Sequence, residues 1–119
     1  MTATLTHQGN IATITVQGQL LKHDYDQMLR ESGRIIAEVG RVKLLIVGKS
    51  FAGFEKARGW GDLSFMMEHD EDVVKIAIVA ELRWRDELLM FFSAGMRVAE
   101  VKFYTPEQQG WAEAWLAED

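Results

Sequence analysis

Hydrophobic and polar positions alternate along residues 2–7 and again along residues 11–17. In the first segment Ala3 and Leu5 share one face while threonines occupy the other, which is the two-residue period of a half-buried β-strand. Residues 8–10 between the two segments are Gln, Gly and Asn, which favour turns. The pattern predicts an N-terminal β-hairpin.

The spacing of apolar residues changes to that of a helix after the hairpin. Asp24 is a suitable N-cap, and Gln27 follows it three positions later, as in a capping box. Gly40 ends the apolar stripe in the manner typical of helix C-termini. We therefore predict a helix that starts at Asp24 and ends at Gly40.

Three later segments have the composition of strands. Residues 42–47 contain an uninterrupted apolar run, and residues 73–80 contain a similar one. Continuous runs of this length are typical of interior parallel strands, because these are buried on both faces. Residues 98–104 complete the set of predicted strands.

Helical spacing separates these strands from one another. It predicts a helix over residues 57–69, although Gly59 and Gly61 weaken the first turn. A further helix is predicted over residues 83–94, where Gly95 marks its end.

The last predicted helix has the clearest start signal in the chain. Thr105, Pro106 and Gln108 supply an N-cap, a proline at the first helical position and a capping-box partner. The order of elements is then β-β-α-β-α-β-α-β-α, which predicts a single α/β domain over residues 1–119. We expect one mixed, mostly parallel layer of five strands, with the N-terminal hairpin and about four helices.

Composition narrows the classes of function. Lys and Arg number 13 against 18 Asp and Glu, and the resulting net charge of −5 disfavours a nucleic-acid partner. The absence of cysteine excludes disulfides and thiolate metal sites. The sequence has no signal-peptide pattern and no apolar run near the ~20 residues of a membrane span, so we expect a cytoplasmic protein without an integral membrane segment.

Candidate catalytic and metal-binding residues are few. Residues 48–52 resemble a nucleophile elbow around Ser50, but His69 is the one histidine that follows them. His69 lies in the acidic segment 68–72, without a second histidine at ligand spacing. We expect no catalytic site, no metal and no cofactor.

The second half of the chain has more large apolar side chains than one buried stripe requires. Most of them are readily explained as core, but surplus apolar surface also marks a partner interface or a cleft for an apolar ligand. The candidate ligand or partner surface consists of Phe51, Phe54, Trp60, Met66, Met67 and Trp84.

A cluster of charges over residues 81–86 follows the predicted strand 73–80. Ligands of α/β sheets commonly bind beyond the carboxyl ends of the strands, so Arg83 and Arg85 are candidate contacts to an anion. Alternating charges at the start of a helix are also typical of a surface that faces solvent.

Several segments stand in an order and spacing that together are specific, although none of them is a strict motif. They are Asp24-Tyr25, 42–47, 75–79 followed by Arg83-Trp84, 99–104, Pro106-Glu107 and 114–116. Through these segments nearly the whole chain resembles the SpoIIAA-like family of single-domain bacterial relatives of STAS domains. The resemblance implies a mixed sheet of about five strands with helices packed on it, in agreement with the order of elements.

STAS domains, to which this family is related, are mostly non-enzymatic regulators that bind a partner protein. Some of them switch by phosphorylation of a serine at the start of the second helix. In this chain Phe54, Glu55 and Lys56 stand where the family's Asp-Ser-Ser-Gly stretch belongs, while Ser50 comes too early and Ser64 too late. We therefore expect no phosphorylation switch.

Two functions are consistent with the sequence. The first is a non-catalytic binding or regulatory module that acts through protein–protein contact, either as a homodimer through exposed aromatic surface or with another protein. The alternative is a carrier or sensor of a small apolar ligand or lipid, because similar folds occur in CRAL-TRIO lipid carriers. The sequence leaves open whether the surplus apolar residues line a cavity or an interface.

Overall fold

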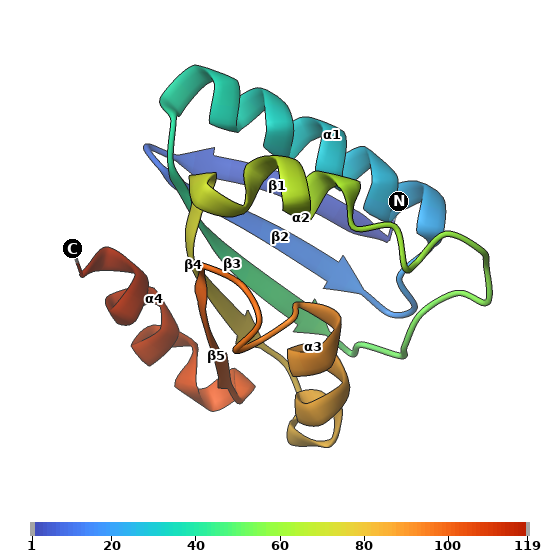
Figure 1. Ribbon diagram of the computed structural model, residues 1–119. Helices are drawn as coiled ribbons and strands as arrows, with labels where there is room; N and C mark the ends of the chain where they lie inside the picture. The colour runs from blue at the N-terminus through green and yellow to red at the C-terminus, as the bar shows by residue number, and fades with distance from the viewer. Residues whose placement is uncertain (1, 119) are drawn as a thin grey trace.

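Five strands form one mixed sheet in the computed structural model, which describes residues 2–118 (Figure 1). The strands are β1 (Ala3–Gln8), β2 (Ile11–Gln17), β3 (Val42–Lys49), β4 (Val73–Val79) and β5 (Glu100–Tyr104). The α-helices are α1 (Lys22–Val39), α2 (Ser64–His69), α3 (Arg85–Phe91) and α4 (Gln109–Ala117). Three short 3₁₀ turns are η1 (Asp70–Asp72), η2 (Leu82–Trp84) and η3 (Pro106–Gln108). The predicted α/β fold is confirmed.

The strands follow one another across the sheet in chain order, from β1 to β5. β1 pairs antiparallel with β2, and the other neighbours pair in parallel. Right-handed crossovers that all step in one direction place their helices on the same face of a sheet. Accordingly α1, α2 and α3 pack on one face, which we call the front, and α4 packs on the other, the back.

Each face of the sheet has its own hydrophobic core. On β3, Leu44 and Ile46 belong to the front core, whereas Leu45 and Val47 belong to the back core. All four residues are buried, so this strand is buried on both faces, as its continuous apolar run predicts. The front core is the larger because three helices contribute to it.

Two lysines hold the C-terminal end of α4 against the back of the sheet. Lys43 Nζ donates to the carbonyl oxygens of Leu116 and Glu118, both at 2.7 Å. Lys75 Nζ donates to those of Trp115 and Glu118, at 2.8 Å and 3.0 Å. Cationic donors at this end of a helix satisfy carbonyls without intrahelical partners and complement the helix dipole.

α4 covers β3, β4 and β5, and the back core that it builds also contacts Ile11 of β2. A groove of about 490 Å³ runs beside the helix, and its lining includes Thr6, Thr13, Glu113 and Leu116. The hairpin therefore contributes threonines from both strands to this groove.

The first helix begins earlier than predicted, at Lys22 rather than after Asp24. The predicted capping box of Asp24 and Gln27 is wrong, because Asp24 accepts hydrogen bonds from Thr2 N (2.8 Å) and Thr2 Oγ1 (2.6 Å) at the start of the hairpin. These bonds hold the pKa of the Asp24 carboxyl below its usual range. Glu55 Oε1 instead accepts a hydrogen bond from Lys22 N–H, at 2.9 Å.

Two other helix boundaries also differ from the prediction. The helix predicted over residues 57–69 is limited to α2, because Gly59 adopts a φ of +93° and the chain before Ser64 is irregular. The helix predicted over residues 83–94 is split into η2 and α3 and ends at Phe91, shortly before Ser93 with its φ of +57°. The capping box at Thr105 is confirmed, with Thr105 N–H donating to Gln108 Oε1 at 3.0 Å.

Candidate functional site

Four of the six candidate surface residues pack together beneath the front helices. Phe51 is only 3% exposed and meets Phe54 and Trp84 edge to face, with ring centroids 5.4 Å and 4.9 Å apart. Phe54 contacts Trp60 in the same way at 5.4 Å and stacks on Phe91 at 4.6 Å. Aromatic pairs of this geometry stabilise a core. These side chains therefore build the front layer rather than an exposed surface.

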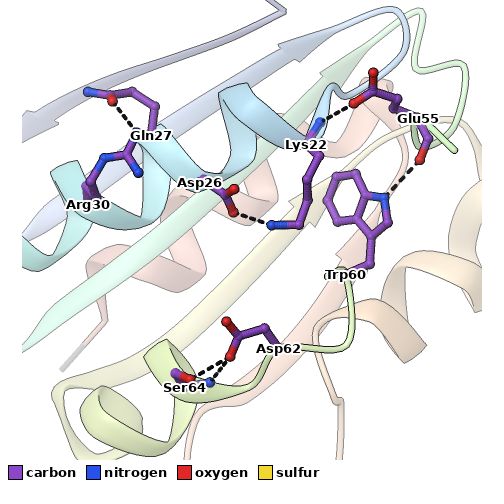
Figure 2. A network of polar contacts seen from close by, with 8 residues as sticks. All are labelled: Lys22, Asp26, Gln27, Arg30, Glu55, Trp60, Asp62 and Ser64. Atoms are coloured by element: carbon purple, nitrogen blue, oxygen red, sulfur yellow. Dashed lines mark hydrogen bonds and ion pairs between the residues drawn. The ribbon is translucent and has the colours of Figure 1, made fainter. Parts of the chain in front are cut away.

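The segment between β3 and α2 is tied to the start of α1 by polar contacts (Figure 2). Glu55 bonds through its carboxylate to Lys22 N, and its carbonyl oxygen accepts a hydrogen bond from Trp60 Nε1 at 2.8 Å. Lys22 Nζ pairs with Asp26 and lies 5.6 Å from the centre of the Trp60 ring. These contacts fix Trp60 over the aromatic cluster, so this irregular segment is well anchored.

The front core encloses a cavity of about 70 Å³ with an almost wholly apolar lining. Tyr25, Phe65 and Ile78 are among its walls, together with Phe54 and Phe91. Pockets that hold drug-sized molecules have volumes of roughly 300–1,000 Å³. In this conformation the cavity is too small for such a ligand.

An arginine is buried at the border of this layer. The Arg97 side chain is 9% exposed, and its Nε lies 3.8 Å from Asp70 Oδ1 without a hydrogen-bond partner in residues 2–118. Its Nη1 donates one long bond of 3.4 Å to the carbonyl oxygen of Phe92. Burial lowers the pKa of Arg97 and raises the pKa of Tyr25 to about 12, because both charged forms lose solvation.

The two methionines of the candidate set have different surroundings. Met66 is half-buried, whereas Met67 is 77% exposed. Asp70, just after α2, accepts a hydrogen bond from Val98 N at 3.3 Å and so joins this helix to the loop before β5. Met96 in that loop is 85% exposed, and Val98 is also exposed. We call Met67, Met96 and Val98 the methionine patch.

Sequence patterns identified only one member of the methionine patch. Residues 98–104 were predicted as a strand, so Val98 was expected to belong to the sheet. The structure places Val98 in the loop instead, because β5 begins at Glu100. The usable signal is Gly95, which lies in the loop after α3 with a φ of +80°, because apolar residues beside a glycine of this kind are usually in a loop, where a core is seldom built.

Arg83 and Arg85 each lie close to a carboxylate of a nearby residue. Arg83 Nε lies 3.9 Å from Glu81 Oε2, and its guanidinium stacks on the ring of Trp84, 5.2 Å from the centroid. Arg85 pairs with its neighbour Asp86 at 3.1 Å. Both side chains are exposed, so each is paired locally at the surface.

Ser50 and His69 lie at opposite ends of the sheet. Ser50 follows the carboxyl end of β3, whereas His69 precedes the amino end of β4, and these strands are parallel. A strand of this length separates them by roughly 20 Å. His69 instead contacts Asp72 at 3.2 Å. No Ser–His pair can form between these two residues.

Across residues 2–118, no group of three or more His, Asp or Glu side chains is placed to hold a metal ion. Within the same range, no helix is long and apolar enough to cross a membrane.

Comparisons with known proteins identify the family. No curated protein matches the chain significantly. Among solved structures, an uncharacterised protein from Shewanella loihica PV-4, described as a member of the DUF3478 family with a SpoIIAA-like fold, is similar with a TM-score of 0.66 and 22% identity. The match covers 97% of this chain and 92% of that one, and it shows the fold. The SpoIIAA-like family model matches residues 11–117. The chain therefore belongs to the SpoIIAA-like family.

Proposed function

We propose that this chain is a non-catalytic binding module that acts in the cytoplasm through contact with another protein. The observation that carries the proposal is the methionine patch on the front of the molecule. Met67 and Met96 are each more than three-quarters exposed, and the Asp70 bond to Val98 holds their two segments together. Flexible, polarizable methionines are common at protein-binding surfaces.

Among residues 2–118, the side chains considered as candidate catalytic groups are not brought together, which supports a non-catalytic role. Ser50 and His69 are too far apart to form a nucleophile and base. Arg83 and Arg85 are each paired with a neighbouring carboxylate. The strand order never reverses, so the sheet lacks the crevice where open α/β sheets usually bind their ligands.

Resemblance to STAS domains also supports protein contact, since such domains mostly act by binding a partner. The proposal places that contact at the methionine patch and not at the aromatic residues predicted from the sequence. Phe51, Phe54, Trp60 and Trp84 would act indirectly, by supporting the front helices from below.

The test is quantitative capture of partner proteins by three forms of the chain. The double variant M67K/M96K replaces both methionines of the patch with lysine, and Trp111→Lys places one lysine at an exposed apolar position on α4. We expect one partner to bind the wild type and Trp111→Lys alike, and to bind M67K/M96K at least about tenfold less. Identical recovery of every captured protein by all three forms would contradict the proposal.

A second candidate function is the carriage or sensing of a small apolar ligand, favoured by the apolar lining of the front cavity. The cavity of about 70 Å³ would have to widen several-fold to reach the roughly 300 Å³ of an ordinary ligand pocket. α2 is the element that could move, because none of its residues is buried. Native mass spectrometry separates this candidate from the first, since a carried ligand adds mass to the chain.

A further inference from the structure

The two segments that carry the methionine patch expose further apolar surface. Met67 N–H donates to the carbonyl oxygen of Leu63 at 2.9 Å, so these two residues lie one helical turn apart on the same face. Leu63 is half exposed, and Met67, Met96 and Val98 are more exposed still. The patch therefore continues along α2 as an apolar row that begins at Leu63.

Acidic side chains follow Met67 directly. Residues 68–72 contain four Asp or Glu, and residues 63–72 contain no Lys or Arg. Glu68 and Glu71 are both exposed, and we call them the acidic rim. Glu71 comes four residues after Met67, which is about one helical turn, so the rim borders the apolar row.

The acidic rim is not neutralised within the chain, whereas the other two acidic residues of this segment are engaged. Asp70 accepts a backbone hydrogen bond from the loop before β5, and Asp72 contacts His69 at 3.2 Å. Within residues 2–118, Glu71 forms no ion pair, and the one ion pair of Glu68 is a distant contact to His69, at 3.9 Å. The rim therefore presents its negative charge to solvent.

The cation of the second segment does not offset this charge at the surface. Arg97 is the only Lys or Arg in residues 95–99. Its side chain is largely buried, and its guanidinium lies against Asp70 and the carbonyl oxygen of Phe92. What these two segments expose is therefore apolar or negatively charged.

We propose that the partner protein contacts this surface with a basic segment, in which apolar side chains stand beside Lys or Arg. The proposal rests on the proposed function, because it uses the same patch. Apolar side chains of the partner pack on Leu63, Met67 and Met96, and its cations lie against Glu68 and Glu71. Complementary charge of this kind speeds association and rejects acidic partners.

Two synthetic peptides of opposite charge test the chemistry of this surface. The first is an amphipathic helix of about 14 residues built from leucine and lysine, and the second has glutamate in place of every lysine. Fluorescence anisotropy of the labelled peptides measures their affinity for the chain. We expect the lysine peptide to bind at least about tenfold more tightly than the glutamate peptide. Its affinity should fall as salt rises from about 50 mM to about 500 mM, because salt screens exposed charges.

Variants of matched charge separate the acidic rim from the net charge of the chain. E68Q/E71Q removes two negative charges from the rim, whereas E107Q/E113Q removes two from exposed positions on η3 and α4. We expect the rim variant to bind the lysine peptide at least about fivefold less tightly, and the second variant to bind it like the wild type.

A third variant tests the apolar half of the contact. M67Q/M96Q removes both methionine side chains without changing the charge, and both positions are exposed, so the fold does not depend on them. We expect this variant to bind the lysine peptide at least about tenfold less tightly than the wild type.

Failure of this proposal is distinguishable from failure of the proposed function. A lysine peptide that does not bind, that binds no better than the glutamate peptide, or that loses equal affinity in E68Q/E71Q and E107Q/E113Q would overturn the basic partner. Partner capture judges the function separately. If M67K/M96K loses its partner there while E68Q/E71Q keeps it, the contact is at the patch and only its charge chemistry is wrong. If M67K/M96K keeps every partner, the patch itself is wrong.

Discussion

The front and the back of the sheet differ in how many helices cover them. Three helices cover the front, where they enclose an aromatic cluster and a small cavity. One helix covers part of the back, where lysines secure its last turn. The topology causes this asymmetry, because every right-handed crossover in a sheet that grows in one direction returns over the same face.

The difference between the two faces shows which surfaces of a small α/β domain are left exposed for contact with other molecules. Elements on the front are packed against one another, and the proposed binding surface uses side chains on the outside of α2 and of the loop before β5. On the back, α4 lies over β3, β4 and β5, and the groove beside it is lined in part by the hairpin strands.

The largest expected effect is on the free energy of unfolding, when a large side chain is shortened in one core or the other. Ile78→Ala enlarges the existing front cavity, so we expect it to lower the free energy of unfolding by about 3–5 kcal/mol. Leu116→Ala on α4 opens toward the groove on the back, where neighbours and water can fill the space, and should cost about 2–3 kcal/mol. Urea denaturation measures both values. An equal or reversed order would show that the front core is not the better enclosed.

A smaller effect tests how α4 is held. Lys75→Met removes hydrogen bonds to Trp115 O and Glu118 O, so it should lower the free energy of unfolding by about 1–2 kcal/mol. Lys102→Met is the control, because Lys102 Nζ lies 4.8 Å from the centre of the Trp115 ring, much as Lys75 Nζ does at 5.0 Å, but donates to no carbonyl of α4 within residues 2–118. Equal losses in the two variants would assign the effect to stacking alone.

The buried arginine of the front should contribute little to stability. Arg97 has one long hydrogen bond and one distant carboxylate, so the cost of burying its charge is poorly offset. We expect Arg97→Met to leave the free energy of unfolding unchanged or to raise it by up to about 1 kcal/mol. A loss above about 3 kcal/mol in thermal or urea unfolding would instead indicate a well-paired charge.

The smallest expected effect is the pH dependence of stability that arises from the two tyrosines, one on each face of the sheet. Burial raises the pKa of Tyr25 to about 12, and burial with nearby Glu118 and Glu100 raises the pKa of Tyr104. Both folded values lie above the unfolded value of about 10. The stability they contribute is therefore complete below about pH 10 and declines as the pH rises toward 12.

Ultraviolet titration of the phenolates should show two steps, with Tyr25 ionising last. Tyr104→Phe should remove the earlier step and leave the later one. A single step near the ordinary tyrosine pKa would show that the front layer admits solvent at Tyr25.

Most of the fold followed from local patterns in the sequence. The apolar run of β3 indicated burial on both faces, and Thr105 with Gln108 marked the start of the last helical segment correctly. The start of α1 was missed because its two decisive contacts, Glu55 with Lys22 and Thr2 with Asp24, join residues far apart in the sequence. Periodicity carries no information about such contacts.

The candidate site was harder to predict. Aromatic abundance did point to Phe51, Phe54 and Trp84 as a group, but abundance does not distinguish an inward cluster from an exposed one. Met96 was outside the candidate set because its exposure depends on where α3 ends and β5 begins. Strand order, which leaves β1 as an uncharged edge, is also not encoded in the pattern of any single element.

Native mass spectrometry of the purified wild-type chain tests the central claim, that this molecule works through protein contact and not by holding a small ligand. We predict the bare chain mass, 13.5 kDa for each copy, with no additional mass. A monomer that carries an adduct of a few hundred daltons, released on denaturation, would contradict the claim and favour the apolar-ligand function.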